Sequence, residues 1–122
     1  MPEEKSIDLN KLVTDKITRG VADVSLCLEN KKLGDEEITR LAEMDILADV
    51  THLDLGENEI SDTGLSALCN SRFTHKLKVL NLKSNQITEV GAQYLAQAKN
   101  FSQLEQLILK FKHGDALHLN PL

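Results

Sequence analysis

The amino-acid sequence predicts a short α/β solenoid, with a parallel sheet on the concave face and helices on the convex face. One observation is an apolar repeat, in which Leu28, Leu55, Leu82 and Leu109 recur at a spacing of 27 residues (55 − 28, 82 − 55 and 109 − 82). The other is a change in the spacing of the apolar residues inside each unit. They first occur at every second residue, as in a strand, and then at the spacing of a helix. A unit of this kind buries its apolar side only by stacking on its neighbours.

The segment LDLGENEISDTGLSAL, which begins at Leu53, shows both periods of one unit. Leu53 and Leu55 point to one side of an extended chain and Asp54 to the other, as a strand requires. Further along, Leu65 and Leu68 are three residues apart and share one helix face. A short polar side chain accepts hydrogen bonds from the free N–H groups of a helix start, so Ser61 or Asp62 is the expected cap.

Two segments, LDLGENEISDTGLSAL and LNLKSNQITEVGAQYL, match the pattern LxLxxNxIxxxGxxxL. This pattern resembles the leucine-rich repeat, and the glycine before the helix resembles the ribonuclease-inhibitor-like class. The resemblance covers residues 24–109. It weakens in the outer repeats, where Lys31 and Lys112 stand at the asparagine position and Glu37 at the glycine position.

The resemblance implies a structural role for Asn58 and Asn85, which hydrogen bond to the backbone where each strand turns and form a ladder along the solenoid. A buried amide without partners costs about 1–3 kcal/mol. The lysines at the same position in the outer repeats fit terminal units, where one side has no neighbouring repeat.

The expected organisation is one domain with residues 1–22 as an N-terminal helical cap, 23–110 as repeats and 111–122 as a C-terminal cap or tail. The apolar spacing over residues 7–19 predicts a helix that ends at Gly20. At the other end, the apolar residues Ala116, Leu117, Leu119 and Leu122 either fold over the last strand or leave its edge exposed. An exposed edge is a template for pairing with another copy.

Composition excludes several functional classes. The formal charge of −5 argues against a general nucleic-acid binder, although residues 1–70 are acidic and 71–122 mildly basic. No apolar run reaches the length of a membrane helix and no signal peptide is recognised, so we expect no membrane association. The expected location is cytoplasmic, or a host cell if the protein is an exported bacterial effector. Cys27 and Cys69 are expected to be reduced thiols.

No motif indicates catalysis, a metal site or a cofactor, so we expect a protein that is not an enzyme. The four histidines lack the spacing of a zinc motif. Glu29 and Asp54 are expected to approach one another on neighbouring strands as hydrated carboxylates, rather than as an acid–base pair. Cys27 lies on the same face and has no basic neighbour to activate it.

What remains is a surface made of the residues between the inward leucines. The resemblance implies a protein partner on the concave face, as in regulatory scaffolds. The expected contact residues are Asp54, Val79, Asn81, Lys83, Ile108, Lys110 and Phe111. Two alternatives remain. The C-terminal tail packs over Ile108 and Phe111, or the protein self-associates through an open C-terminal edge. The expected state is a monomer or a weak homo-oligomer.

Overall fold

The computed structural model describes residues 7–110 and the backbone of residues 116–119. A six-stranded sheet runs in the order β1-β2-β3-β4-β5-β6. Pairs from β2 to β5 are parallel, and the two outer pairs are antiparallel. The strands are β1 Ile17–Arg19, β2 Val24–Cys27, β3 His52–Asp54, β4 Val79–Leu82, β5 Gln106–Lys110 and β6 Ala116–Leu119. The helices are α1 Leu9–Lys16, α2 Asp35–Leu41, α3 Asp62–Cys69, α4 Glu89–Gln97 and the 3₁₀ helix η1 Asp45–Asp49.

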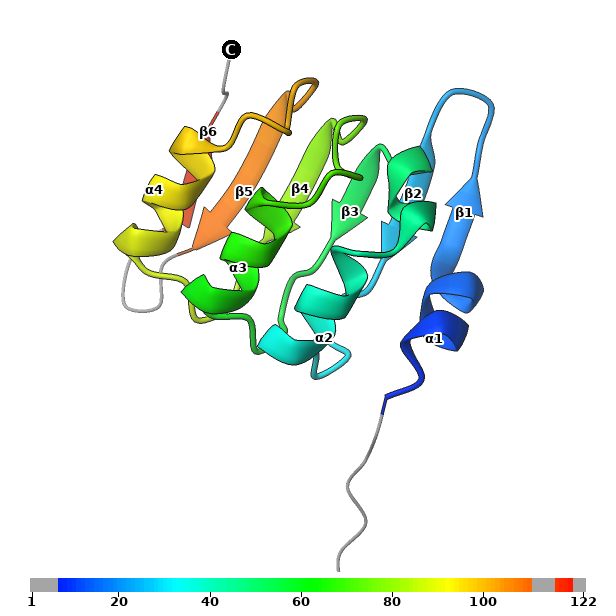
Figure 1. Ribbon diagram of the computed structural model, residues 1–122, viewed down its shortest axis with the longest axis horizontal. Coiled ribbons are helices and arrows are strands. Elements are labelled where there is room, and N and C mark those ends of the chain that lie inside the picture. The colour runs from blue at the N-terminus through cyan, green and yellow to red at the C-terminus, as the bar shows by residue number, and fades with distance from the viewer. Residues whose placement is uncertain (1–6, 111–115, 120–122) are drawn as a thin grey trace, which may run out of the picture.

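The sheet and the helices form two layers (Figure 1). Helices α2, α3 and α4 lie side by side over one face of the sheet, and each connects two successive strands of the parallel part. This arrangement confirms the predicted α/β solenoid. Within the part of the chain that is described, no helix combines the length and apolar character needed to cross a membrane.

The parallel strands are held in one register by the inward leucines. Leu26, Leu53, Leu80 and Leu107 are register partners across β2 to β5, and each is at most 2% exposed. Because successive side chains of a strand alternate between faces, the residue after each of these leucines points away from the core. Those residues, Cys27, Asp54, Asn81 and Ile108, are also register partners.

A buried asparagine closes the turn after the second and third parallel strands. The Asn58 Oδ1 atom accepts hydrogen bonds from the backbone N–H groups of Lys31 and Leu33, both at 3.0 Å. Its Nδ2 group donates to the carbonyl oxygen of Leu28 at 2.9 Å. Asn85 repeats this pattern one unit later, accepting from Ile60 N–H and donating to the Leu55 carbonyl. Each asparagine therefore joins its own repeat to the preceding one.

The same turns place a residue in the left-handed backbone region. Asn30, Glu57 and Ser84 have φ values of 57°, 56° and 60°, and they are spaced by one repeat. None of them is glycine, although side chains other than asparagine and aspartate disfavour this conformation. Glu57 and Ser84 are each followed by a buried asparagine whose hydrogen bonds hold the turn in place, and the turn at Asn30 is held by Asn58 of the next repeat, which accepts the Lys31 N–H.

A second ladder joins the repeats on the helix side. The Asp35 carboxylate, at the start of α2, accepts the Ser61 N–H at 2.8 Å, the Gly64 N–H at 3.1 Å and the Ser61 hydroxyl at 2.5 Å. Asp62, at the start of α3, accepts the N–H and hydroxyl of Thr88 in the same way. Ser61 is the N-cap of α3, which decides between the two predicted capping residues.

This second ladder explains the glycine of the repeat. A Cβ atom at Gly64 would lie 2.5 Å from Asp35 Oδ1 and 3.1 Å from Asp35 Cα. The equivalent residue of the first repeat is Glu37, and its carboxylate accepts the Gly34 N–H at 2.8 Å. Glu37 fits because no described residue of a preceding repeat places a carboxylate there.

The N-terminal segment differs from the predicted helix over residues 7–19. Helix α1 ends at Lys16, and β1 then pairs antiparallel with β2, with Ile17 opposite Leu26. Ile17 and Thr18 are β-branched and favour an extended chain. The edge of β2 also offers backbone hydrogen bonds that another helical turn would leave unused. The helix prediction was therefore wrong for residues 17–19.

At the other end, β6 pairs antiparallel with β5, with Ala116 opposite Lys110 and Leu119 opposite Leu107. The edge of β5 is therefore occupied by the backbone of residues 116–119. Residue 122, which the sequence grouped with this segment, lies outside the described residues.

Replacing a ladder asparagine tests the contribution of the first ladder. In Asn85→Ala, the buried Ile60 N–H loses its partner, and the Leu55 and Leu82 carbonyl groups each lose one hydrogen bond. We expect the free energy of unfolding to fall by about 2–3 kcal/mol. Urea denaturation followed by circular dichroism measures this. Asn10→Ala, on the exposed surface of α1, is the control and should stay within about 0.5 kcal/mol of wild type. Equal changes in the unfolding free energy of the two variants would show that the buried hydrogen bonds of Asn85 do not contribute to stability.

Replacing a glycine tests the second ladder. Gly64→Ala places a methyl group against the Asp35 carboxylate, so we expect a loss of about 1–3 kcal/mol in unfolding free energy. At Gly34 a Cβ atom meets only Glu37 Oε1, at 3.4 Å. Gly34→Ala is therefore the matched control and should change stability by less than about 1 kcal/mol. Equal losses in the two variants would contradict the proposed clash with Asp35.

Candidate protein-binding face of the sheet

The face of the sheet opposite the helices, called the open face below, carries the outward side chains of β2 to β5. They form two rows across the strands. One row is Ser25, His52, Val79 and Gln106, and the other is Cys27, Asp54, Asn81 and Ile108. Cys27 is exposed and the other seven are half-buried. The leucine core on the other side of the sheet fixes the strands but leaves these side chains free to vary.

Charge is distributed unevenly over the open face and the turns that follow it. Asp54 and the exposed Glu29 lie at the β2–β3 end. Lys83, after β4, and Lys110, the last residue of β5, are exposed at the other end. The structure therefore places the acidic and basic halves of the sequence at opposite ends of one surface.

Asp54 and Asn81 are oriented by the backbone of the turns that follow them. Asp54 Oδ1 accepts the Gly56 N–H at 2.9 Å, and Asn81 Oδ1 accepts the Lys83 N–H at 3.0 Å. One oxygen of the Asp54 carboxylate is thus used in the turn. Its other oxygen and the Asn81 amide group face outward from neighbouring strands.

His52 is held by the neighbouring Thr51 side chain. Thr51 Oγ1 accepts the Val24 N–H at 2.9 Å, donates to the Val24 carbonyl oxygen at 3.1 Å and lies 2.9 Å from His52 Nδ1. The tautomer of His52 determines which of the two atoms donates in this contact.

The apolar residues predicted for the contact surface lie at its basic end. Val79 on β4 and Ile108 on β5 are half-buried and are offset by two residues on adjacent strands. Phe111, the third member of that predicted patch, lies outside the described residues. Val79, Ile108, Lys83 and Lys110 together form an apolar and basic region at one end of the open face.

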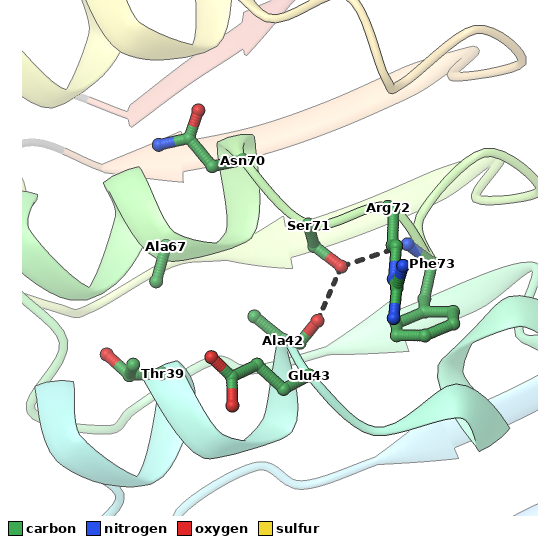
Figure 2. Close-up of a pocket in the computed structure, with 8 residues that line it drawn as sticks. All are labelled: Thr39, Ala42, Glu43, Ala67, Asn70, Ser71, Arg72 and Phe73. Carbon is green, nitrogen blue, oxygen red and sulfur yellow. Dashed lines mark hydrogen bonds between the residues drawn. The ribbon is translucent and has the colours of Figure 1, made fainter.

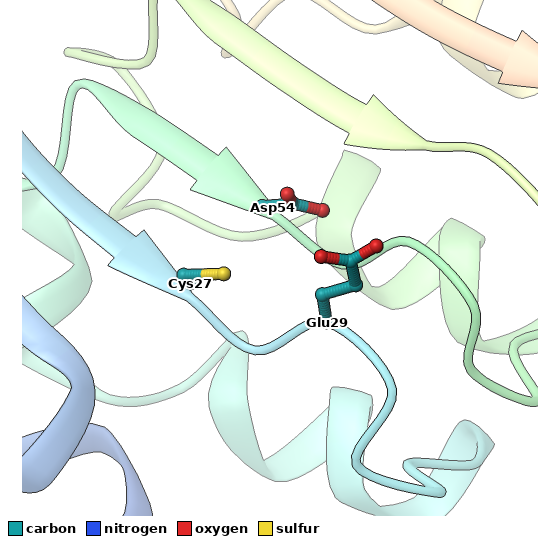
Figure 3. Close-up of side chains that lie close together, drawn as sticks. All are labelled: Cys27, Glu29 and Asp54. Carbon is teal, nitrogen blue, oxygen red and sulfur yellow. The ribbon is translucent and has the colours of Figure 1, made fainter.

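At the acidic end, Cys27, Glu29 and Asp54 come together (Figure 3), and the predicted approach of Glu29 to Asp54 is confirmed. The Sγ atom of Cys27 and one carboxylate oxygen each of Glu29 and Asp54 all lie within 4.8 Å of one another. Cys27 was not among the predicted contact residues. The repeat spacing could have predicted this position, because residues one repeat apart, such as Cys27 and Asp54, are neighbours on adjacent strands.

The helix side carries a pocket of about 560 Å³ between α2 and α3. Figure 2 shows its lining: Thr39, Ala42, Glu43, Ala67, Asn70, Ser71, Arg72 and Phe73. The buried Ser71 hydroxyl donates to the Ala42 carbonyl at 2.6 Å and accepts the Phe73 N–H at 3.1 Å. The Arg72 guanidinium lies 5.2 Å from the centre of the Phe73 ring. These contacts hold the connection after α3 against α2, which is a structural role.

The second cysteine lies on α3, away from the open face. Cys69 is buried, and its burial raises the pKa of the thiol to about 11. The neutral thiol is a poor nucleophile. Cys69 therefore behaves as a core residue, whereas Cys27 is exposed.

Comparison with known proteins agrees with this architecture. Residues 48–69 and 75–96 match the family model described as Leucine Rich repeat. The human NACHT, LRR and PYD domains-containing protein 7 is 38% identical over 76 residues, which cover 60% of this chain and 8% of that protein. The chain therefore matches a small part of a much longer relative.

Both family matches contain one parallel strand, one buried asparagine and one helix of the solenoid. The repeat spacing, the strand register and the asparagine ladder are thus features of the matched segments themselves. Together with the similarity to the human protein, they identify residues 48–69 and 75–96 as leucine-rich repeats.

Proposed function

We propose that this protein is a non-catalytic module that binds a protein partner through the open face of its sheet. The observation that carries the proposal is a sheet face in fixed register, over which no helix of the described residues lies. Its side chains vary from strand to strand, while the leucines behind them do not. Leucine-rich repeat proteins use such extended concave surfaces for binding.

The composition of the open face supports this proposal. Interface centres combine apolar side chains with oriented polar groups, and charged groups sit at the rim. Val79 and Ile108 supply apolar area, and the Asn81 amide is oriented by its bond to the Lys83 backbone. The lysines stand where the strands end, at the rim of that region. We therefore place the centre of the contact over β4 and β5.

The charge gradient also restricts the partner. A surface that is acidic over β2 and β3 and basic over β4 and β5 favours a partner with the opposite order of charges, because complementary potentials speed association and suppress other pairings. Self-association through the edge of β5 is not part of this proposal, since β6 pairs along that edge.

Charge reversal at Lys83 tests the proposal. We expect Lys83→Glu to weaken partner capture by about tenfold, or about 1.4 kcal/mol, because the exposed ammonium group lies beside the apolar region. The measurement is affinity capture from a lysate of the source cell, followed by a binding titration with the partner that is recovered. The melting temperature should stay unchanged, since Lys83 is exposed.

The matched control is Lys99→Glu, which makes the same charge change on the helix side, where Lys99 lines a pocket with residues of α3 and α4. It should bind as wild type does. Equal weakening in both variants would indicate a general charge effect. Weakening in Lys99→Glu alone would move the contact to the helices and contradict the proposal.

A further inference from the structure

The three side chains at the acidic end of the open face have the chemistry of a metal site. Cys27 supplies a thiol, and Glu29 and Asp54 supply carboxylates, with one ligand atom of each within 4.8 Å of the other two. They come from β2, from the turn that follows it and from β3 (Figure 3). Thiolate sulfur and carboxylate oxygen are both established zinc ligands.

The scaffold fixes two of the three ligands before any ion binds. Cys27 and Asp54 are register partners, and the Leu28 N–H, next to Cys27, donates to the Asp54 carbonyl at 2.8 Å. The Gly56 N–H holds Asp54 Oδ1 at 2.9 Å. A backbone donor that orients a ligand carboxylate is what metal sites provide in their outer shell.

In the described part of the chain, no lysine or arginine forms an ion pair with a carboxylate of the cluster. The ion pairs found among the described residues are Lys11–Asp15, Arg19–Asp49, Arg40–Glu37 and Lys78–Asp23. Within that set, neither Glu29 nor Asp54 takes part. Two carboxylates that lie close together repel one another, and a cation between them removes that repulsion.

We propose that Cys27, Glu29 and Asp54 bind a divalent cation of the zinc class. In the bound state, the cation replaces the thiol proton of Cys27, which passes to solvent, and water completes the coordination. Zinc–ligand bonds of about 2.0–2.3 Å keep the ligand atoms of one ion within about 4.6 Å of one another, which is compatible with the 4.8 Å limit found for these three atoms.

The thiol determines the class of cation. Mg²⁺ and Ca²⁺ prefer oxygen ligands, whereas thiolate sulfur favours Zn²⁺ and softer ions. The inference rests on these three ligands and not on partner binding, so it can fail while the proposed protein-binding function holds, and the reverse is also true.

The first test is a titration of the reduced full-length chain with Zn²⁺ by calorimetry, and with Co²⁺ by absorption spectroscopy. We expect one ion per chain and a sulfur-to-cobalt charge-transfer band. Cys27→Ser should abolish the band, and Glu29→Gln and Asp54→Asn should each weaken Zn²⁺ binding by about tenfold or more. Glu57→Gln, an exposed carboxylate outside the cluster, is the matched control and should bind as wild type does.

The second test uses the two thiols of the chain as an internal comparison. At neutral pH iodoacetamide should modify the exposed Cys27 and spare Cys69, which is buried and has a pKa of about 11. Zn²⁺ should protect Cys27 from modification in the wild type but not in Asp54→Asn. No Zn²⁺ binding, or binding and protection that are the same in the three cluster variants and the wild type, would overturn the proposal.

Discussion

Each interior turn of this solenoid depends on one buried asparagine side chain that hydrogen bonds to the backbone of the preceding repeat. Asn58 satisfies the Lys31 and Leu33 N–H groups and the Leu28 carbonyl, none of which has a partner in a regular strand or helix. Without such partners, the buried polar groups of the turn would be unpaired, and each would lower the stability of the folded protein. Because the bonds link one repeat to the next, they also fix the register that aligns the outward residues in rows.

On the helix side, successive repeats are joined by a carboxylate. Asp35 binds the N-cap residue and the Gly64 N–H of the next repeat, so α2 and α3 are joined at their starts as well as by apolar packing. The glycine of the repeat is then a consequence of the carboxylate, because a side chain there would occupy the oxygen's place. The interior repeats are thus joined on both sides of the sheet, and the outward side chains of the open face take no part in either ladder.

Much of the fold follows from the sequence because it depends on apolar spacing. Leu26 and Leu53 predict both the strands and their register, since partners lie one repeat apart. The start of β1 could not be predicted in this way. Ile17 continues the helical apolar pattern of α1, and it is extended because the edge of β2 offers hydrogen bonds. The bond from Asp35 to Gly64 was missed because polar links between repeats leave no apolar period.

The open face was predicted less completely than the scaffold. The register placed Asp54 beside Asn81 and gave the order of charges along the sheet, because both depend on position alone. Side-chain distances do not follow from position. Glu29 lies in the turn after β2, and only the path of that turn brings its carboxylate to within 4.8 Å of the Cys27 sulfur. The sequence therefore predicted that Glu29 approaches Asp54 on the face that carries Cys27, but not that all three side chains form one cluster.

The proposed cation and the proposed partner act on the same electrostatic surface. Without an ion, Glu29 and Asp54 make the β2–β3 end acidic, opposite the lysines at the β4–β5 end. A bound dication offsets the two carboxylates and leaves the thiolate as the remaining negative charge, so the gradient becomes smaller. A partner that contacts only β4 and β5 is insensitive to this change, because exposed charges farther away than about 8–10 Å are largely screened at physiological salt. A partner that spans the whole face loses complementarity when the ion binds, so the dependence of binding on Zn²⁺ reports how much of the sheet the partner covers.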